Sequence, residues 1–302
     1  MKDGRDLLAL GTLGVHLDVA FTHARASHDV DPEDQEPDLR LSEQPRDHVV
    51  ASWMTGVQLG ATYGLGHRVA VSVALPVRVT VLDATFHGEG GEELDVESIH
   101  HRDETIAGLG DLEVGLRFGV VRPEDVPHVA LDLRIACTFP TGHVEEDPYA
   151  LGDAGESHTH TFFGQGAFVP RLGLSLAFLT PNGDFEFGAD GQLSLYAGEN
   201  GYEPPSLGTF SVGYRHGFDV PWLSLALKQY VYVESESFWN GVIAENSGRS
   251  DLGLELGFSA EVGAGFSVGF TGRAVYFSVT NGGTFESPFA GTFSLAWSGE
   301  TL

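Results

Sequence analysis

Four histidines have the side-chain type and the spacing of a transition-metal site. His100 and His101 are adjacent in one predicted loop, and His158 and His160 stand two residues apart in the next long loop. In an extended segment, residues i and i+2 point to the same side, so His158 and His160 would present two imidazoles together. Imidazole suits Zn²⁺, Cu²⁺ or Ni²⁺, which would be the cofactor of such a site.

Two further observations bear on this metal hypothesis. The two loops would emerge on one rim, about two inter-strand spacings (~10 Å) apart, and Asp103 and Glu104 lie near His101 in the sequence. Against it, the chain holds 13 histidines, so that some clustering is expected. The alternative is that these are polar residues of acidic, hydrated loops.

A second group of residues with chemical potential consists of charges that alternate with apolar residues along predicted strands. Alternate residues of a strand share a face, so these charges would line the inside of a closed sheet whose apolar face is outside. Both signs occur, and we therefore expect ion pairs rather than one strong field. The residues expected to line this lumen are Glu113, Arg117, Asp132, Arg134, Arg171, Glu186, Asp190, Lys228, Glu255 and Arg273.

Composition and motifs exclude several classes of protein. With 16 Lys and Arg against 43 Asp and Glu, the net charge is −27, and nucleic acid calls for a basic face. The sequence has no G-x-S-x-G elbow, P-loop, Rossmann fingerprint or C-x-x-C pair, so we predict that it is not an enzyme and assign no catalytic residue. The acidic loops lack the EF-hand pattern and are better explained as solvated segments than as Ca²⁺ sites.

The main pattern in the sequence is alternation with a period of two, which is typical of strands. In residues 129–139, for example, Val, Leu, Ile, Cys and Phe take the odd positions and Ala, Asp, Arg and Thr the even ones. The whole chain gives twelve candidate strands, many of ten residues or more, which is the length that a tilted strand needs to cross a bilayer. They are predicted at 9–24, 50–63, 68–82, 110–121, 128–140, 167–180, 184–198, 207–217, 222–235, 251–261, 265–280 and 288–298.

The connections between these strands alternate between long and short. Long or medium ones are expected at 25–49, 83–109, 141–166, 199–206, 236–250 and 281–287, and short turns lie between them. Outer-membrane barrels combine long extracellular loops with short periplasmic turns. The sequence therefore predicts an all-β fold: residues 1–302 as one antiparallel up-and-down transmembrane β-barrel of about 12 strands.

A soluble sandwich or barrel is the alternative fold, and it would carry many Lys and Glu on its polar face. Here that face is rich in Gly, Ala, Ser and Thr, and the carboxylates concentrate in the loops. We therefore predict that the lipid bilayer of a Gram-negative outer membrane surrounds the chain. Residues 1–14 have no apolar h-region and no small-residue cleavage site, so we expect the export signal peptide to be absent from this sequence.

Three short segments resemble one family of outer-membrane proteins, named for the meta-pathway of phenol degradation. Gly108–Phe118 is similar to the family's GLGDL strand start, Phe139–His143 to its PTG strand end, and Phe163–Gly166 to its G-x-G strand entry. The resemblance covers roughly residues 50–298 in layout and implies a barrel-type porin or transporter for small apolar or aromatic molecules. It carries over no substrate-binding residue, and the His-rich loops depart from it.

These observations favour passage of a small solute through the barrel, with specificity set by the long loops. A different function is also compatible with the sequence: a plugged structural barrel whose His- and acid-rich loops bind a metal ion or a partner outside the cell. Single-channel conductance separates the two functions. The oligomeric state is not specified by any pattern in the sequence.

The metal hypothesis has a direct test in solution. After chelation, the purified protein should bind Zn²⁺ or Cu²⁺, and a variant with both His100→Ala and His158→Ala should lose most of this binding, because two imidazoles of the site are gone. Titration of both proteins with the metal measures the difference. Equal binding by the two proteins would rule out the site.

Overall fold

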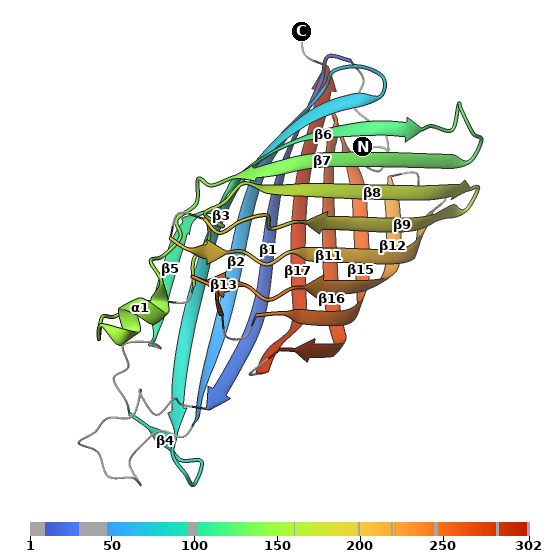
Figure 1. The fold of residues 1–302 in the computed structure, drawn as a ribbon. Coiled ribbons are helices and arrows are strands. Elements are labelled where there is room, and N and C mark those ends of the chain that lie inside the picture. Colours follow the sequence, from blue (N-terminus) through green and yellow to red (C-terminus); the bar gives the residue numbers. More distant parts are fainter. Residues whose placement is uncertain are drawn as a thin grey trace.

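The computed structural model describes residues 10–29, 47–95, 102–159, 161–198, 200–218, 220, 222–244, 247–281 and 284–300. Over these residues it is about 70% strand, with one helix of six residues, α1 (Pro148–Asp153). Figure 1 shows the strands curving round one closed wall, with α1 and the small loop strands gathered at one end. The all-β fold predicted from the alternation is confirmed.

Twelve antiparallel strands form the wall, in chain order, and the first strand pairs with the last. Leu17 of the first strand faces Leu295 of the last, which leaves no open edge between them. The wall strands are β1 (Thr12–Asp29), β2 (Asp47–Gly64), β3 (Val69–His87), β5 (Glu104–Leu109) continued by β6 (Leu112–Val121), β7 (Val129–Phe139), β8 (Val169–Thr180), β9 (Gly183–Gln192), β11 (Leu207–Gly217), β12 (Leu223–Glu234), β15 (Arg249–Gly263), β16 (Phe266–Thr280) and β17 (Thr284–Glu300).

The fourth wall strand is interrupted between β5 and β6. Leu109 faces Val77 and Glu113 faces Ala74, so three residues of this strand lie opposite two of β3. One of those two is Pro76, which has no N–H for the sheet, and a proline inside a sheet is tolerated at such a bulge. The sequence pattern predicted only residues 110–121 as this strand. It missed residues 104–109, because the bulge interrupts the alternation between inward and outward side chains.

Four other strand limits differ from the prediction by four residues or more. β9 ends at Gln192 rather than 198, β1 and β3 continue to Asp29 and His87 rather than to 24 and 82, and β17 begins at Thr284, which shortens the connection expected at 281–287 to residues 281–283. The alternation of long and short connections holds elsewhere. Turns of two to seven residues lie at 65–68, 122–128, 181–182, 218–222 and 264–265, and the opposite end carries the segments 88–103, 140–168, 193–206 and 235–248.

The long segments are folded over their end of the barrel. β10 (Tyr202–Glu203), β13 (Phe238–Trp239) and β14 (Val242–Ile243) form a small separate sheet, and β4 (Glu93–Leu94) extends β3. By loop length this end is the extracellular one. The described residues of these segments therefore form a cap at this end of the barrel.

The two faces of the wall differ in size and polarity. The buried apolar residues of the strands are mostly alanines, such as Ala74, Ala136 and Ala226, and they point inward. Large apolar side chains of consecutive strands are exposed on the outside, among them Ile135, Leu174, Phe187, Phe210, Leu227, Leu256 and Phe293. Such an inverted arrangement is stable where lipid covers the outer face. The described part of the chain contains no helix that is long and apolar enough to cross a bilayer.

A salt bridge ties two of the short turns together. Arg68, after β2, donates a hydrogen bond of 2.6 Å from its guanidinium to Asp125, in the turn between β6 and β7. This bond and the backbone N–H of Arg122 hold the pKa of the Asp125 carboxyl below its usual range. These two turns are thus held together by their own contacts, independently of the loops.

Two substitutions on similarly exposed residues test the lipid contact. Ile135, in the middle of β7, and Val126, in a short turn, are 49% and 47% exposed. Ile135→Arg should lower the free energy of unfolding in phospholipid vesicles by about 2–4 kcal/mol, because it places a charge at mid-membrane depth. Val126→Arg should be nearly neutral. Denaturant titration followed by tryptophan fluorescence measures both, and equal small effects would contradict a lipid-facing wall.

Candidate functional site

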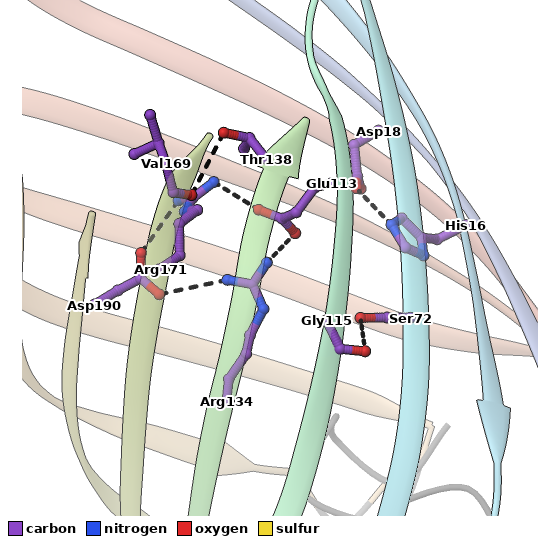
Figure 2. A network of polar contacts seen from close by, with 10 residues as sticks. All are labelled: His16, Asp18, Ser72, Glu113, Gly115, Arg134, Thr138, Val169, Arg171 and Asp190. Atoms are coloured by element: carbon purple, nitrogen blue, oxygen red, sulfur yellow. Dashed lines mark hydrogen bonds and ion pairs between the residues drawn. The ribbon is translucent and has the colours of Figure 1, made fainter. Parts of the chain in front are cut away.

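Four charged side chains form a closed ring on the inner face of β6 to β9. Glu113 accepts hydrogen bonds from Arg134 and, at 2.9 Å, from Arg171. Asp190 accepts from the same two guanidiniums, at 3.4 and 3.2 Å. Figure 2 shows the two arginines, each joined to both carboxylates. This ring cross-links four strands without leaving a net charge.

A second network continues round the wall. Glu186 pairs with Arg215 at 2.8 Å and with Lys228 at 3.4 Å, and Lys228 also reaches Glu255, which pairs with Arg273 at 2.7 Å. Lys228 crosses β11 at Gly213, which faces both Lys228 and Glu186. A Cβ at Gly213 would lie 2.4 Å from Lys228 Cγ, so any larger residue would obstruct this crossing.

A third set of ion pairs lies nearer the turns, where Asp132 accepts from Arg117 at 2.9 Å and from Arg122 at 2.6 Å. All ten charges that the sequence suggested for the lumen therefore take part in ion pairs between strands. Two arginines in these networks, Arg122 and Arg215, were missed. Arg215 lies two residues after Gly213 on the same face of β11, so the alternation could have identified it. Arg122 follows the register shift after Gly119, where the alternation of inward and outward residues fails.

A buried carboxylate attaches the longest described loop to the break in the wall. Asp111 lies between β5 and β6, and its oxygens accept the backbone N–H groups of Gly142, at 2.9 Å, and Gln165, at 2.7 Å. Thr141 completes the contact by accepting the N–H of Leu112 at 2.8 Å. Charge-assisted bonds of this kind are stronger than neutral ones. Asp111 therefore clamps both ends of the segment 142–165 to one point.

The backbones of this loop touch each other at the clamp. A Cβ at Gly142 would lie 2.7 Å from the Cα of Gly164 and 2.8 Å from the carbonyl oxygen of Leu109, so only glycine fits there. The three short segments singled out in the sequence, 108–118, 139–143 and 163–166, thus meet at this one place. The close contact between their backbones explains why these segments contain glycines.

Aromatic side chains from three loops pack together beside the clamp. The rings of Phe162, Tyr202 and Trp239 lie with centroids 4.7–5.5 Å apart, and Val144 is buried against them. Burial raises the pKa of Tyr202 to about 12. This apolar cluster holds the extracellular cap over the barrel.

Two cavities meet at Phe162 and Phe163 inside the wall. The first, of about 400 Å³, is lined by the clamp, by Glu113 and Arg171 of the ion ring, and by Pro204 and Pro205. The second, of about 630 Å³, lies between β1, β2, β3, β15, β16 and β17. A third, of about 250 Å³, continues toward the turns and shares Glu255 and Thr271 with the second. The segment 161–165 therefore narrows the lumen between cavities.

The four histidines of the metal hypothesis are mostly outside the described residues. This applies to His100, His101 and His160. His158 is buried, and its Nδ1 lies 3.0 Å from the carbonyl oxygen of Glu156. Within the described ranges no group of three or more His, Cys, Asp or Glu side chains could hold a metal ion. The metal site stays a prediction.

Comparison with known proteins agrees with this geometry. The model of the family described as "Putative MetA-pathway of phenol degradation" matches residues 48–287. The chain belongs to this family. The resemblance seen in three short segments is confirmed, and the match includes the clamp and the ion networks. No curated protein matches the sequence.

A solved structure shows the same fold. The COG4313 outer membrane channel from Pseudomonas putida F1 has a TM-score of 0.65 at 11% identity, and the alignment covers 99% of each chain. The translocator domain of the autotransporter NalP from Neisseria meningitidis (TM-score 0.46, 10% identity, 98% of this chain and 91% of that one) and the P. putida toluene transporter TodX (0.42, 11%, 96% and 90%) are more distant. The closed barrel and its apolar outer face make this family member an outer-membrane protein.

The clamp can be removed by one substitution. Asp111→Ala deletes two hydrogen bonds to a charged acceptor, each worth about 1.5–3 kcal/mol, and should free the loop. We expect faster cleavage by a glutamate-specific protease at Glu145 or Glu156 while the barrel stays folded. Asp125→Ala removes a carboxylate at the opposite end and should leave cleavage unchanged. A loop that is equally resistant in both variants would show that Asp111 does not hold it.

Proposed function

We propose that this barrel is a channel or transporter through which a small apolar or aromatic solute crosses the outer membrane. The observation that carries the proposal is the pair of cavities that meet at Phe162 and Phe163 inside the wall. A cavity of about 630 Å³ is within the usual range for small-molecule sites. The two rings stand where a solute would move from the loops toward the turns.

Three further points support the proposal. The second cavity combines the apolar side chains of Met54, Phe162 and Phe163 with the hydroxyls of Thr22 and Thr80, a mixture suited to an apolar molecule with one polar group. The family description refers to phenol degradation, and a solved structure with the same fold is described as an outer membrane channel. The paired charges of the wall give the lumen no single dominant sign.

The other function considered from the sequence was a plugged barrel whose loops bind a metal ion or a partner. The cap is compatible with either function, and no contact among the described residues favours the plugged barrel. We therefore treat the segment 161–165 as a constriction of the passage. Electrical recording of the purified protein in a planar bilayer distinguishes the two.

Shortening one ring at the constriction should enlarge the pore. Phe163→Ala removes a buried ring that both cavities share, so we expect larger unitary conductance than wild type. Phe168→Ala is the matched control, because Phe168 is exposed and packs edge-on against Phe139. It should leave the conductance unchanged. Electrical silence of wild type and Phe163→Ala alike would contradict the proposal and support a plugged barrel.

A further inference from the structure

Arg78 is a cation at the junction of the two lumen cavities. It lies on β3, on the same face as Ala74 and Thr80, and lines both cavities together with Phe162 and Phe163. The residue is exposed, and at this inward position the exposure is to the lumen. The alternation of β3 could have identified Arg78 from the sequence as a lumen residue, but it was not among the ten charges selected.

Arg78 differs from the other charges of these cavities in its partners. Among the residues that the structure describes, no carboxylate lies within 4.0 Å of its guanidinium, whereas Arg171 has Glu113 and Arg273 has Glu255. Asp111 is hydrogen-bonded to two backbone N–H groups rather than to Arg78. Asp18, which also lines the second cavity, lies 3.8 Å from His16 and has no Lys or Arg partner among the described residues. The guanidinium therefore has free donors that face the cavity.

The strands on either side of Arg78 leave space around it. Its cross-strand neighbours are Gly56 on β2 and Gly108 on β5. No atom lies within 4 Å of where a Cβ of Gly56 would be, and Gly56 lines the second cavity. At Gly108 the space is filled by the ring of Phe163, whose Cδ2 lies 2.9 Å from where a Cβ of Gly108 would be. The guanidinium of Arg78 therefore has open space on one side and an aromatic ring near the other.

We propose that Arg78 and the rings of Phe162 and Phe163 form a binding site for a small aromatic carboxylate. This inference deepens the proposed function and rests on it, because it names the class of solute that pauses in the lumen. A guanidinium offers a carboxylate two parallel N–H donors, which a point charge does not. The second cavity has the volume for the ring, and Met54 and the two phenylalanines supply an apolar surface for it.

The net charge of −27 opposes anions at long range, but it does not decide what binds at Arg78. At physiological ionic strength, exposed charges are screened beyond about 8 Å. Most of the carboxylates lie outside the wall strands, and Glu113 and Glu255, which line the cavities, are paired with arginines. Among the described residues that line the two cavities, Arg78 is the cation with no carboxylate within 4.0 Å.

Binding of benzoate to the purified barrel in detergent tests the site without requiring transport. Isothermal titration calorimetry should detect benzoate binding to wild type, and Arg78→Gln should weaken it about tenfold or more, since charged hydrogen bonds are lost. Arg78→Lys should bind with intermediate affinity. Arg117→Gln is the matched control, because it removes a cation of the same wall while Asp132 keeps Arg122. It should bind like wild type.

The outcomes separate this inference from the proposed function. Acetate, which lacks the ring, and benzyl alcohol, which lacks the carboxylate, should compete poorly with benzoate. Equal benzoate affinity in wild type and Arg78→Gln would overturn the site, and so would displacement by acetate at equal concentration. The open-channel conductance should persist in Arg78→Gln, so loss of benzoate binding with conductance intact supports both claims. Unchanged mobility on unheated SDS gels verifies that the variants are folded.

Discussion

The bilayer interior offers no hydrogen-bond partner, so every backbone N–H and C=O within it has to be paired inside the protein. A sheet satisfies this requirement only if its two edges meet, as β1 and β17 do here. Closure also fixes which residues face lipid, because alternate side chains of each strand point to opposite faces. The exposed Ile, Leu and Phe rows and the small or charged inner face follow from this single constraint.

The inner face then has to accommodate charge in a confined space. It does so by pairing across strands: Glu113, Arg134, Arg171 and Asp190 close a ring, and a second network runs from Glu186 to Arg273. The same principle attaches the loop, since the Asp111 carboxylate is satisfied by backbone N–H groups rather than by a cation. As a result Phe162 and Phe163 are held across the lumen, and Arg78 is left to face the cavities.

Much of the fold was predictable from the sequence because lipid imposes a strict alternation. In β7, apolar residues at odd positions and small or charged ones at even positions gave both the strand and its faces. The prediction failed where the parity shifts: at the bulge opposite Pro76, which concealed β5, and after Gly119, where Arg122 turns inward. The clamp was not predictable either. Gly110-Asp111, Pro140-Thr141-Gly142 and Gly164–Gly166 are far apart in sequence, and only the loop's return to the wall brings them together.

The central claim is that this protein has an apolar outer face in lipid and a polar, water-filled interior, and spin labels along β7 test it most directly. In a Cys137→Ser background, single cysteines introduced at residues 131–138 would carry the labels, and collision with oxygen and with a water-soluble nickel chelate would be measured in vesicles. The account predicts a period of two, with oxygen favoured at 131, 133, 135 and 137 and the chelate favoured at 132, 134, 136 and 138. The same preference at all positions, or the reverse alternation, would contradict it.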